Sequence, residues 1–219
     1  MLVILPTAIS GAREHSKHHS VQRKVALILG LCGLLGALAG ATLANYLSGN
    51  VLEMGFGGLL LASALWMGLG ERVISKIAQG HVAELNFLPR DTLWVSAVCG
   101  FPIGIVVGLT GIGGGVLIVP VLVLIFHFPI RVAVGTSLAS IAFTSLGGII
   151  GYILNGIGMS PLPYSIGYIN LPMWLCLAAT SIPLAQLGSK AAHALPAKQL
   201  KYIFIAVMAY IGLRMIGIV

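Results

Sequence analysis

The stretch GLTGIGGGVLIVP, residues 108–120, decides how this chain is built. It holds five glycines and ends in a proline, within an otherwise apolar run. In the interior of a soluble helix each glycine costs about 1 kcal/mol relative to alanine, and a proline costs about 3 kcal/mol. The stretch therefore predicts a break in a helix, at a place where other interactions stabilise the break.

The composition around this stretch places the chain in a membrane. Hydrophobic residues make up 58% of the 219 residues and charged residues only 8%, and the mean hydropathy is +1.04. An ordinary soluble domain carries roughly 25% charged residues. The apolar runs are continuous and do not alternate as the strands of a membrane barrel do. We therefore expect an all-α, polytopic protein whose partner is the lipid bilayer.

Five apolar runs are each long enough to cross a hydrocarbon core of about 30 Å as a helix. They cover residues 25–47, 51–69, 132–154, 169–187 and 202–219.

Part of the chain repeats itself. Residues 36–67 can be laid without gaps over residues 184–215, so that Gly40 meets Gly188, Phe56 meets Phe204 and Met67 meets Met215. Upstream, residues 5–11 weakly match residues 142–148. Such self-similarity predicts two copies of one unit. We expect residues 1–69 to be the C-terminal part of a first transmembrane repeat, 70–91 a cytoplasmic linker, and 92–219 a complete second repeat.

The first copy has no counterpart of the glycine-rich stretch. We therefore expect the first repeat to be truncated at its N-terminus.

Loop charge predicts that the two copies are inverted, because lysine and arginine are enriched in short cytoplasmic loops. Residues 12–24 and 190–201 are rich in lysine and arginine, whereas their counterparts at 155–168 and 48–50 have none. The predicted cytoplasmic loops are residues 12–24, 70–91 and 190–199. The predicted external loops are residues 48–50 and 155–168.

Inverted repeats are typical of secondary transporters, whose substrate sites lie where broken helices meet. Duplication in a structural membrane protein is the alternative.

The glycine-rich stretch lies between two basic residues, Arg90 and Arg131. If both of these are cytoplasmic, the chain between them must cross the membrane an even number of times, either as two short crossings or as a re-entrant hairpin. Freed amides at a helix N-terminus can bind an anion. Alternatively, the glycines only allow helices to pack closely, as Gly104, Gly108, Gly111 and Gly115 would.

The run of residues 108–153, with its GxGGGxxxxP turn and the GTS at 135–137, resembles the signature of the TauE/SafE family of sulfite exporters and organosulfur permeases. Residues 6–16 resemble the end of the family's first motif region, and residues 183–204 resemble its last hairpin. The resemblance implies a transporter of sulfite, sulfonate or related small sulfur-containing anions, in a bacterial or archaeal cytoplasmic membrane.

The predicted substrate site combines backbone amides with hydroxyl groups. Eight residues make it up: Gly113, Gly114 and Gly115 by their amides, and Thr110, Thr136, Ser137, Thr7 and Ser10 by their hydroxyls. The alternative is that each hydroxyl bonds back to a carbonyl one turn earlier in its own helix, as serine and threonine commonly do.

Other functions are less well supported. Glu53 and Asp91 lie at the ends of the apolar runs, and the spans hold no carboxylate, so we expect no enzyme. A non-transporting scaffold or accessory subunit remains the alternative. The basic residues form no stripe typical of nucleic-acid binding.

His15, His18 and His19 have a spacing that could hold a metal. We interpret them instead as solvated loop residues and expect no metal or cofactor. A monomer and a homo-oligomer are both compatible with the sequence.

Overall fold

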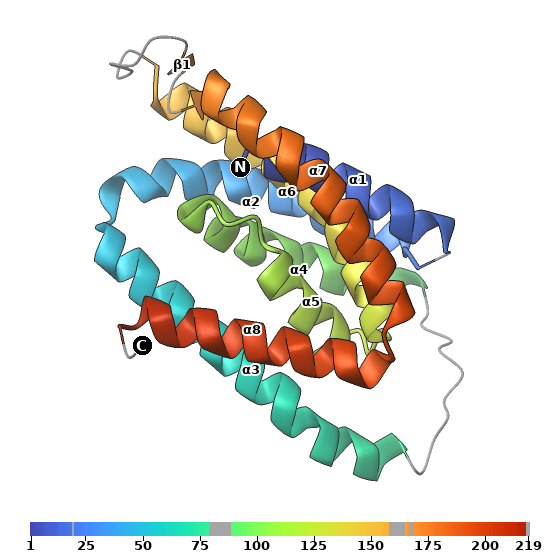
Figure 1. Cartoon of the computed structure of the whole chain (residues 1–219). Helices are drawn as coiled ribbons and strands as arrows, with labels where there is room; N and C mark the ends of the chain where they lie inside the picture. Colours follow the sequence, from blue (N-terminus) through green and yellow to red (C-terminus); the bar gives the residue numbers. More distant parts are fainter. Residues whose placement is uncertain (19, 79–88, 158–164, 167–168, 218–219) are drawn as a thin grey trace.

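The computed structural model describes residues 1–18, 20–78, 89–157, 165–166 and 169–217. Nearly all of this part is helical, which confirms the all-α prediction (Figure 1). The helices are α1 (Ile4–Lys17), α2 (Arg23–Leu43), the 3₁₀ turn η1 (Ala44–Tyr46), α3 (Gly49–Ala78), α4 (Pro89–Thr110), α5 (Gly115–Leu124), α6 (Ile130–Asn155), α7 (Leu171–Ala194) and α8 (Ala197–Met215). The strands β1 (Ser165–Ile166) and β2 (Ile169–Asn170) form a short antiparallel pair.

Five helical segments of the described chain are long and apolar enough to cross a membrane, and four of them correspond to predicted spans. They are Arg23–Tyr46, Gly49–Leu69, Thr92–Thr110, Ile130–Asn155 and Leu171–Ala192. The fifth prediction, residues 202–219, was wrong in its bounds: α8 ends at Met215 and begins earlier, taking in Lys198 and Lys201. Lys198 and Lys201 lie near the start of α8, and Arg214 lies in its last turn.

The predicted loops are shorter in the structure than in the sequence analysis. Helix α1 continues to Lys17 and α2 starts at Arg23, so the first basic loop is reduced to a few residues. Helix α3 runs to Ala78 and α4 starts at Pro89, so the predicted linker is helical at both ends. The rest of that linker, residues 79–88, lies outside the described residues, as do residues 158–164 and 167–168 of the predicted external loop 155–168.

Helix α2 lies at the centre, with α4 and α6 packed along it in the same direction (Figure 1). Its contacts with α4 advance in the same order along both helices, as expected for a parallel pair: Leu29 lies by Gly100, Gly33 by Gly104, and Ala37 by Gly108. A side chain added at Gly104 or Gly108 would overlap a backbone carbonyl of α2. The predicted close packing through these two glycines is therefore confirmed.

The remaining helices pack around this parallel group. Helix α1 runs antiparallel to α6: Gly11 lies by Leu138 and Met1 by Gly148. Helix α7 lies beside α1, and α3 packs against α8. The N-terminus of α7 is capped by Asn170, whose side chain accepts a hydrogen bond from the amide of Met173 at 3.0 Å. Arg131, at the start of α6, donates to the carbonyl of Leu195 at the end of α7 at 2.5 Å.

His15 contradicts our interpretation of the basic loop. It lies inside α1, its side chain is fully buried, and it packs against Gly135 of α6. The helix extends through the predicted loop and turns this position towards α6, which is why the histidine is not solvated. His18 is exposed as expected, and His19 lies outside the described residues.

Candidate functional site

The glycine-rich stretch breaks the helix as predicted. Helix α4 ends at Thr110 and α5 begins at Gly115, and the chain turns back between them (Figure 1). Gly111, Gly113 and Gly114 have φ angles of 70°, 93° and 68°. These left-handed conformations cost other residues about 1–2 kcal/mol but are open to glycine. We call residues 111–115 the glycine turn.

Two buried amides of the glycine turn have no acceptor among the described residues. The amide of Gly115 donates to the carbonyl of Gly113 at 2.8 Å, and the carbonyl of Gly114 accepts from the amides of Leu117 and Ile118. Among the described residues, nothing accepts a hydrogen bond from the amides of Gly113 or Gly114, although both residues are buried. A buried donor without a partner costs about 1–3 kcal/mol. Of the three predicted amides, two are therefore free to bind a ligand and one is occupied.

The walls of the glycine turn come from three helices. A side chain added at Gly113 would meet Ile4 of α1, one added at Gly114 would overlap Val107 of α4, and one added at Gly115 would meet Ile141 of α6. Ile141 lies near the middle of α6, a 26-residue helix that crosses the whole fold. The N-terminus of α5 therefore lies at mid-depth within the helical bundle.

Tyr152 is a neighbour of the glycine turn that the sequence analysis missed. Its hydroxyl donates to the carbonyl of Gly108 at 2.8 Å, and a side chain added at Gly111 would lie 3.4 Å from the same hydroxyl. Since α4 ends at Thr110, that carbonyl lacks the partner an unbroken helix would provide. The hydroxyl of a tyrosine in an apolar span needs a polar partner. This requirement could have identified Tyr152 from the sequence.

We expect Tyr152→Phe to destabilise the protein by about 1 kcal/mol, because the Gly108 carbonyl loses its donor. The measurement is the thermal unfolding midpoint in detergent. Tyr210→Phe is the matched control, since Tyr210 of α8 is 57% exposed. Equal midpoints for the two variants would show that the Tyr152 hydroxyl does not stabilise the end of α4.

Three of the predicted hydroxyls bond back to their own helices. Thr110 donates to Val106 at 2.8 Å, Ser137 donates to Val134 at 2.8 Å, and Thr7 bonds to Val3 and Ile4 at 3.0 and 2.9 Å. A hydroxyl carries one proton. Each of these groups therefore presents lone pairs unless it rotates, and lone pairs repel an anion. For these three hydroxyls the structure therefore agrees with the alternative, in which each bonds back to a carbonyl of its own helix.

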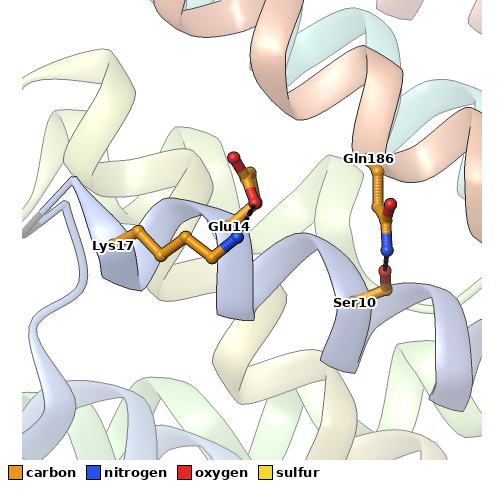
Figure 2. A network of polar contacts seen from close by, with 4 residues as sticks. All are labelled: Ser10, Glu14, Lys17 and Gln186. Atoms are coloured by element: carbon orange, nitrogen blue, oxygen red, sulfur yellow. Dashed lines mark hydrogen bonds and ion pairs between the residues drawn. The ribbon is translucent and has the colours of Figure 1, made fainter.

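The other two hydroxyls lie in different parts of the fold. Thr136 is fully buried and accepts a hydrogen bond from the amide of Gln22 at 3.0 Å, at the connection between α1 and α2. Ser10 accepts from the side-chain amide of Gln186 on α7 at 3.0 Å (Figure 2). The structure therefore does not bring all eight predicted residues into one cluster. The spacing of a motif shows which residues share a helical face, but not which neighbouring helix that face meets.

Comparison with known proteins supports the resemblance seen in the sequence. The family model described as "Sulfite exporter TauE/SafE" matches residues 1–215. A probable membrane transporter of Methanocaldococcus jannaschii is 28% identical over 217 residues, which is 99% of this chain and 76% of that protein. The probable membrane transporter proteins YunE and YdhB of Bacillus subtilis are each 29% identical, over 71% and 68% of this chain.

The chain spans about three fifths of the length of the two Bacillus proteins, 60% and 59%. No solved structure matches the chain. The family match covers nearly every residue, including the glycine turn. Together with the five apolar helices, it shows that this multi-pass membrane protein belongs to the TauE/SafE family of membrane transporters.

Proposed function

We propose that the protein moves a small sulfur-containing anion, such as sulfite or a sulfonate, across the cell membrane, and that the glycine turn binds this anion. One observation carries the proposal: at the N-terminus of α5, two buried amides, of Gly113 and Gly114, have no acceptor among the residues that the structure describes. Helix N-termini carry partial positive charge and unsatisfied N–H groups, which suit an anion. The substrate class follows the family's description as sulfite exporters.

The chemistry of the glycine turn suits transport. Its donors are neutral amides, with no lysine or arginine in the turn. A site that must release its ligand on the other side of a membrane has to bind weakly. Neutral dipoles at mid-depth would bind an anion without trapping it, whereas a buried arginine would hold it too tightly.

The proposal assigns different roles to the predicted hydroxyls. Thr110 ends α4 next to the glycine turn, and Thr7 lies one helical turn beyond Ile4, which packs against Gly113. These two could turn their protons towards a bound anion. Thr136 lies at the connection between α1 and α2, and Ser10 lies against Gln186 of α7. Ser137, which follows Thr136 in α6, bonds back to Val134. We place these three hydroxyls away from the anion bound at the glycine turn.

We further propose that the two halves are inverted copies, α1 to α3 matching α6 to α8. The antiparallel packing of α1 on α6 and the contacts of α3 with α8 support this. A second pair of contacts also supports it. Helix α1 packs against α7, and their counterparts in the other half, α6 and α2, likewise pack against each other. In an inverted repeat each helix runs opposite to its counterpart.

Flux into reconstituted vesicles tests the proposed function. We expect saturable sulfite uptake, and Thr110→Val should raise its KM about tenfold, because a hydrogen bond to a charged group contributes about 1.5 kcal/mol. Thr42→Val is the matched control, since the Thr42 hydroxyl also bonds back within its helix, to Ala39 at 2.7 Å, but at the exposed end of α2. Vesicles that take up no more sulfite than protein-free ones would favour the scaffold alternative.

The predicted topology gives a separate test of the inverted repeat. In a chain without its three cysteines, a cysteine at Ser16 should react with an impermeant maleimide only in inside-out vesicles. A cysteine at Ser48, in the exposed connection before α3, should react only in intact cells. Labelling of position 16 from outside would contradict the assigned orientation, because both basic loops should face the cytoplasm.

A further inference from the structure

A charged groove lies between α1 and α7, away from the glycine turn. It encloses about 600 Å³. Its polar lining comes from two helices: Ser10, Arg13, Glu14 and Lys17 on α1, and Gln186 and Lys190 on α7. The spacings of three, four and seven residues on α1, and of four on α7, place each set on one helical face.

The groove carries excess positive charge. It holds three cationic side chains and one carboxylate, a net charge of +2 at neutral pH. Lys17 pairs with Glu14 at 2.7 Å (Figure 2). This hydrogen bond from Lys17 holds the pKa of the Glu14 carboxyl below its ordinary value, so Glu14 is ionised at neutral pH. Among the described residues, no carboxylate pairs with Arg13 or Lys190.

Two neutral side chains, Ser10 and Gln186, also line the groove. The hydroxyl of Ser10 accepts its hydrogen bond from Gln186, at 3.0 Å, and so its own proton remains available. The side-chain amide of Gln186 has a second N–H as well. Figure 2 shows these two side chains pointing towards each other from facing helices, one helical turn from Glu14.

We propose that this groove binds an oxyanion, with Arg13 and Lys190 neutralising its charge and Ser10 and Gln186 donating hydrogen bonds to its oxygens. The oxyanion is either a free sulfur oxyanion or the phosphate of an anionic lipid, which share this chemistry. Ile9 and Pro6 also line the groove, and the Ile9 side chain is 52% exposed, which provides an apolar surface for lipid tails. Basic pockets between membrane helices bind such headgroups.

The double variant Arg13→Met/Lys190→Met tests the groove in phosphatidylcholine nanodiscs. Both residues are exposed, and an unchanged unfolding midpoint without ligand checks that the variant folds. The control is Lys198→Met, which removes an exposed lysine of α8 outside the groove. Two readouts are taken: equilibrium binding of radiolabelled sulfite, and the rise in unfolding midpoint on adding phosphatidylglycerol.

If the groove takes free anions, we expect sulfite binding about tenfold weaker in the double variant than in the control. If it takes lipid, the stabilisation by phosphatidylglycerol should disappear instead. Ser10→Ala should weaken the same readout without a change in charge. The proposal is overturned if the double variant matches Lys198→Met in both readouts. Sulfite binding that survives in the double variant reports the glycine turn, so the two proposals can fail separately.

Discussion

Gly104→Leu should prevent the chain from accumulating as a folded membrane protein. A side chain at position 104 of α4 would overlap the carbonyl oxygen of Gly33 and lie 2.7 Å from its Cα atom. Backbone cannot move aside as a flexible side chain can. Overpacking typically costs 1–3 kcal/mol, and we expect at least the upper end because the central helix α2 would be displaced along its length.

The measurement is the monodisperse peak of detergent-extracted protein in size-exclusion chromatography. Gly58→Leu is the matched control: Gly58 also lies within an apolar helix, α3, but no atom of the described residues lies within 4 Å of a Cβ added there. If Gly104→Leu gave as much folded protein as Gly58→Leu, the close crossing of α2 and α4 would be refuted.

Gly114→Ala should have the second largest effect, on both stability and transport. The residue has a φ of 68°, which costs alanine about 1–2 kcal/mol, and the new methyl group would overlap Val107. The strained φ angle and the overlap with Val107 can be relieved only if the turn changes shape. Such a change would reorient the Gly114 amide. We expect a lower unfolding midpoint and at least a tenfold loss of sulfite flux, about 1.4 kcal/mol in free energy.

Gly115→Ala separates this effect from a simple increase in size. Gly115 begins α5 without a positive φ, and among the described residues its added methyl group would meet only the end of the Ile141 side chain, at 3.0 Å. We expect nearly unchanged stability and flux. Val107→Ala in the Gly114→Ala background should recover part of the stability by removing the overlap. Equal behaviour of Gly114→Ala and Gly115→Ala would mean that the left-handed turn is not needed.

The sequence was sufficient to predict the helical class, four of the spans and the break at the glycine turn, because these depend on local composition. It could not divide the glycines by role. Gly104 and Gly108 face α2 and allow close packing, whereas Gly113 and Gly114 form the turn. That division depends on which side of α4 meets α2, which the one-dimensional pattern does not contain.

Contacts between distant residues account for the other differences. Tyr152 reaches Gly108 across 44 residues, and Ser10 meets Gln186 across 176. Thr136 follows the glycine turn closely in the motif, yet its hydroxyl bonds the amide of Gln22. The single predicted site therefore separates into a glycine turn, a charged groove and a buried helix connection.

The most direct test of the central claim observes the amides of the glycine turn while the anion binds. Labelling with [1-¹³C,¹⁵N]glycine selects, by NMR, amides that follow another glycine, which here are those of Gly58, Gly114, Gly115 and Gly148. We predict that sulfite shifts the Gly114 resonance saturably. The Gly115 resonance should shift less, because its amide already bonds to Gly113, and those of Gly58 and Gly148 should stay in place. A Gly114 resonance that does not move at saturating sulfite would contradict the account.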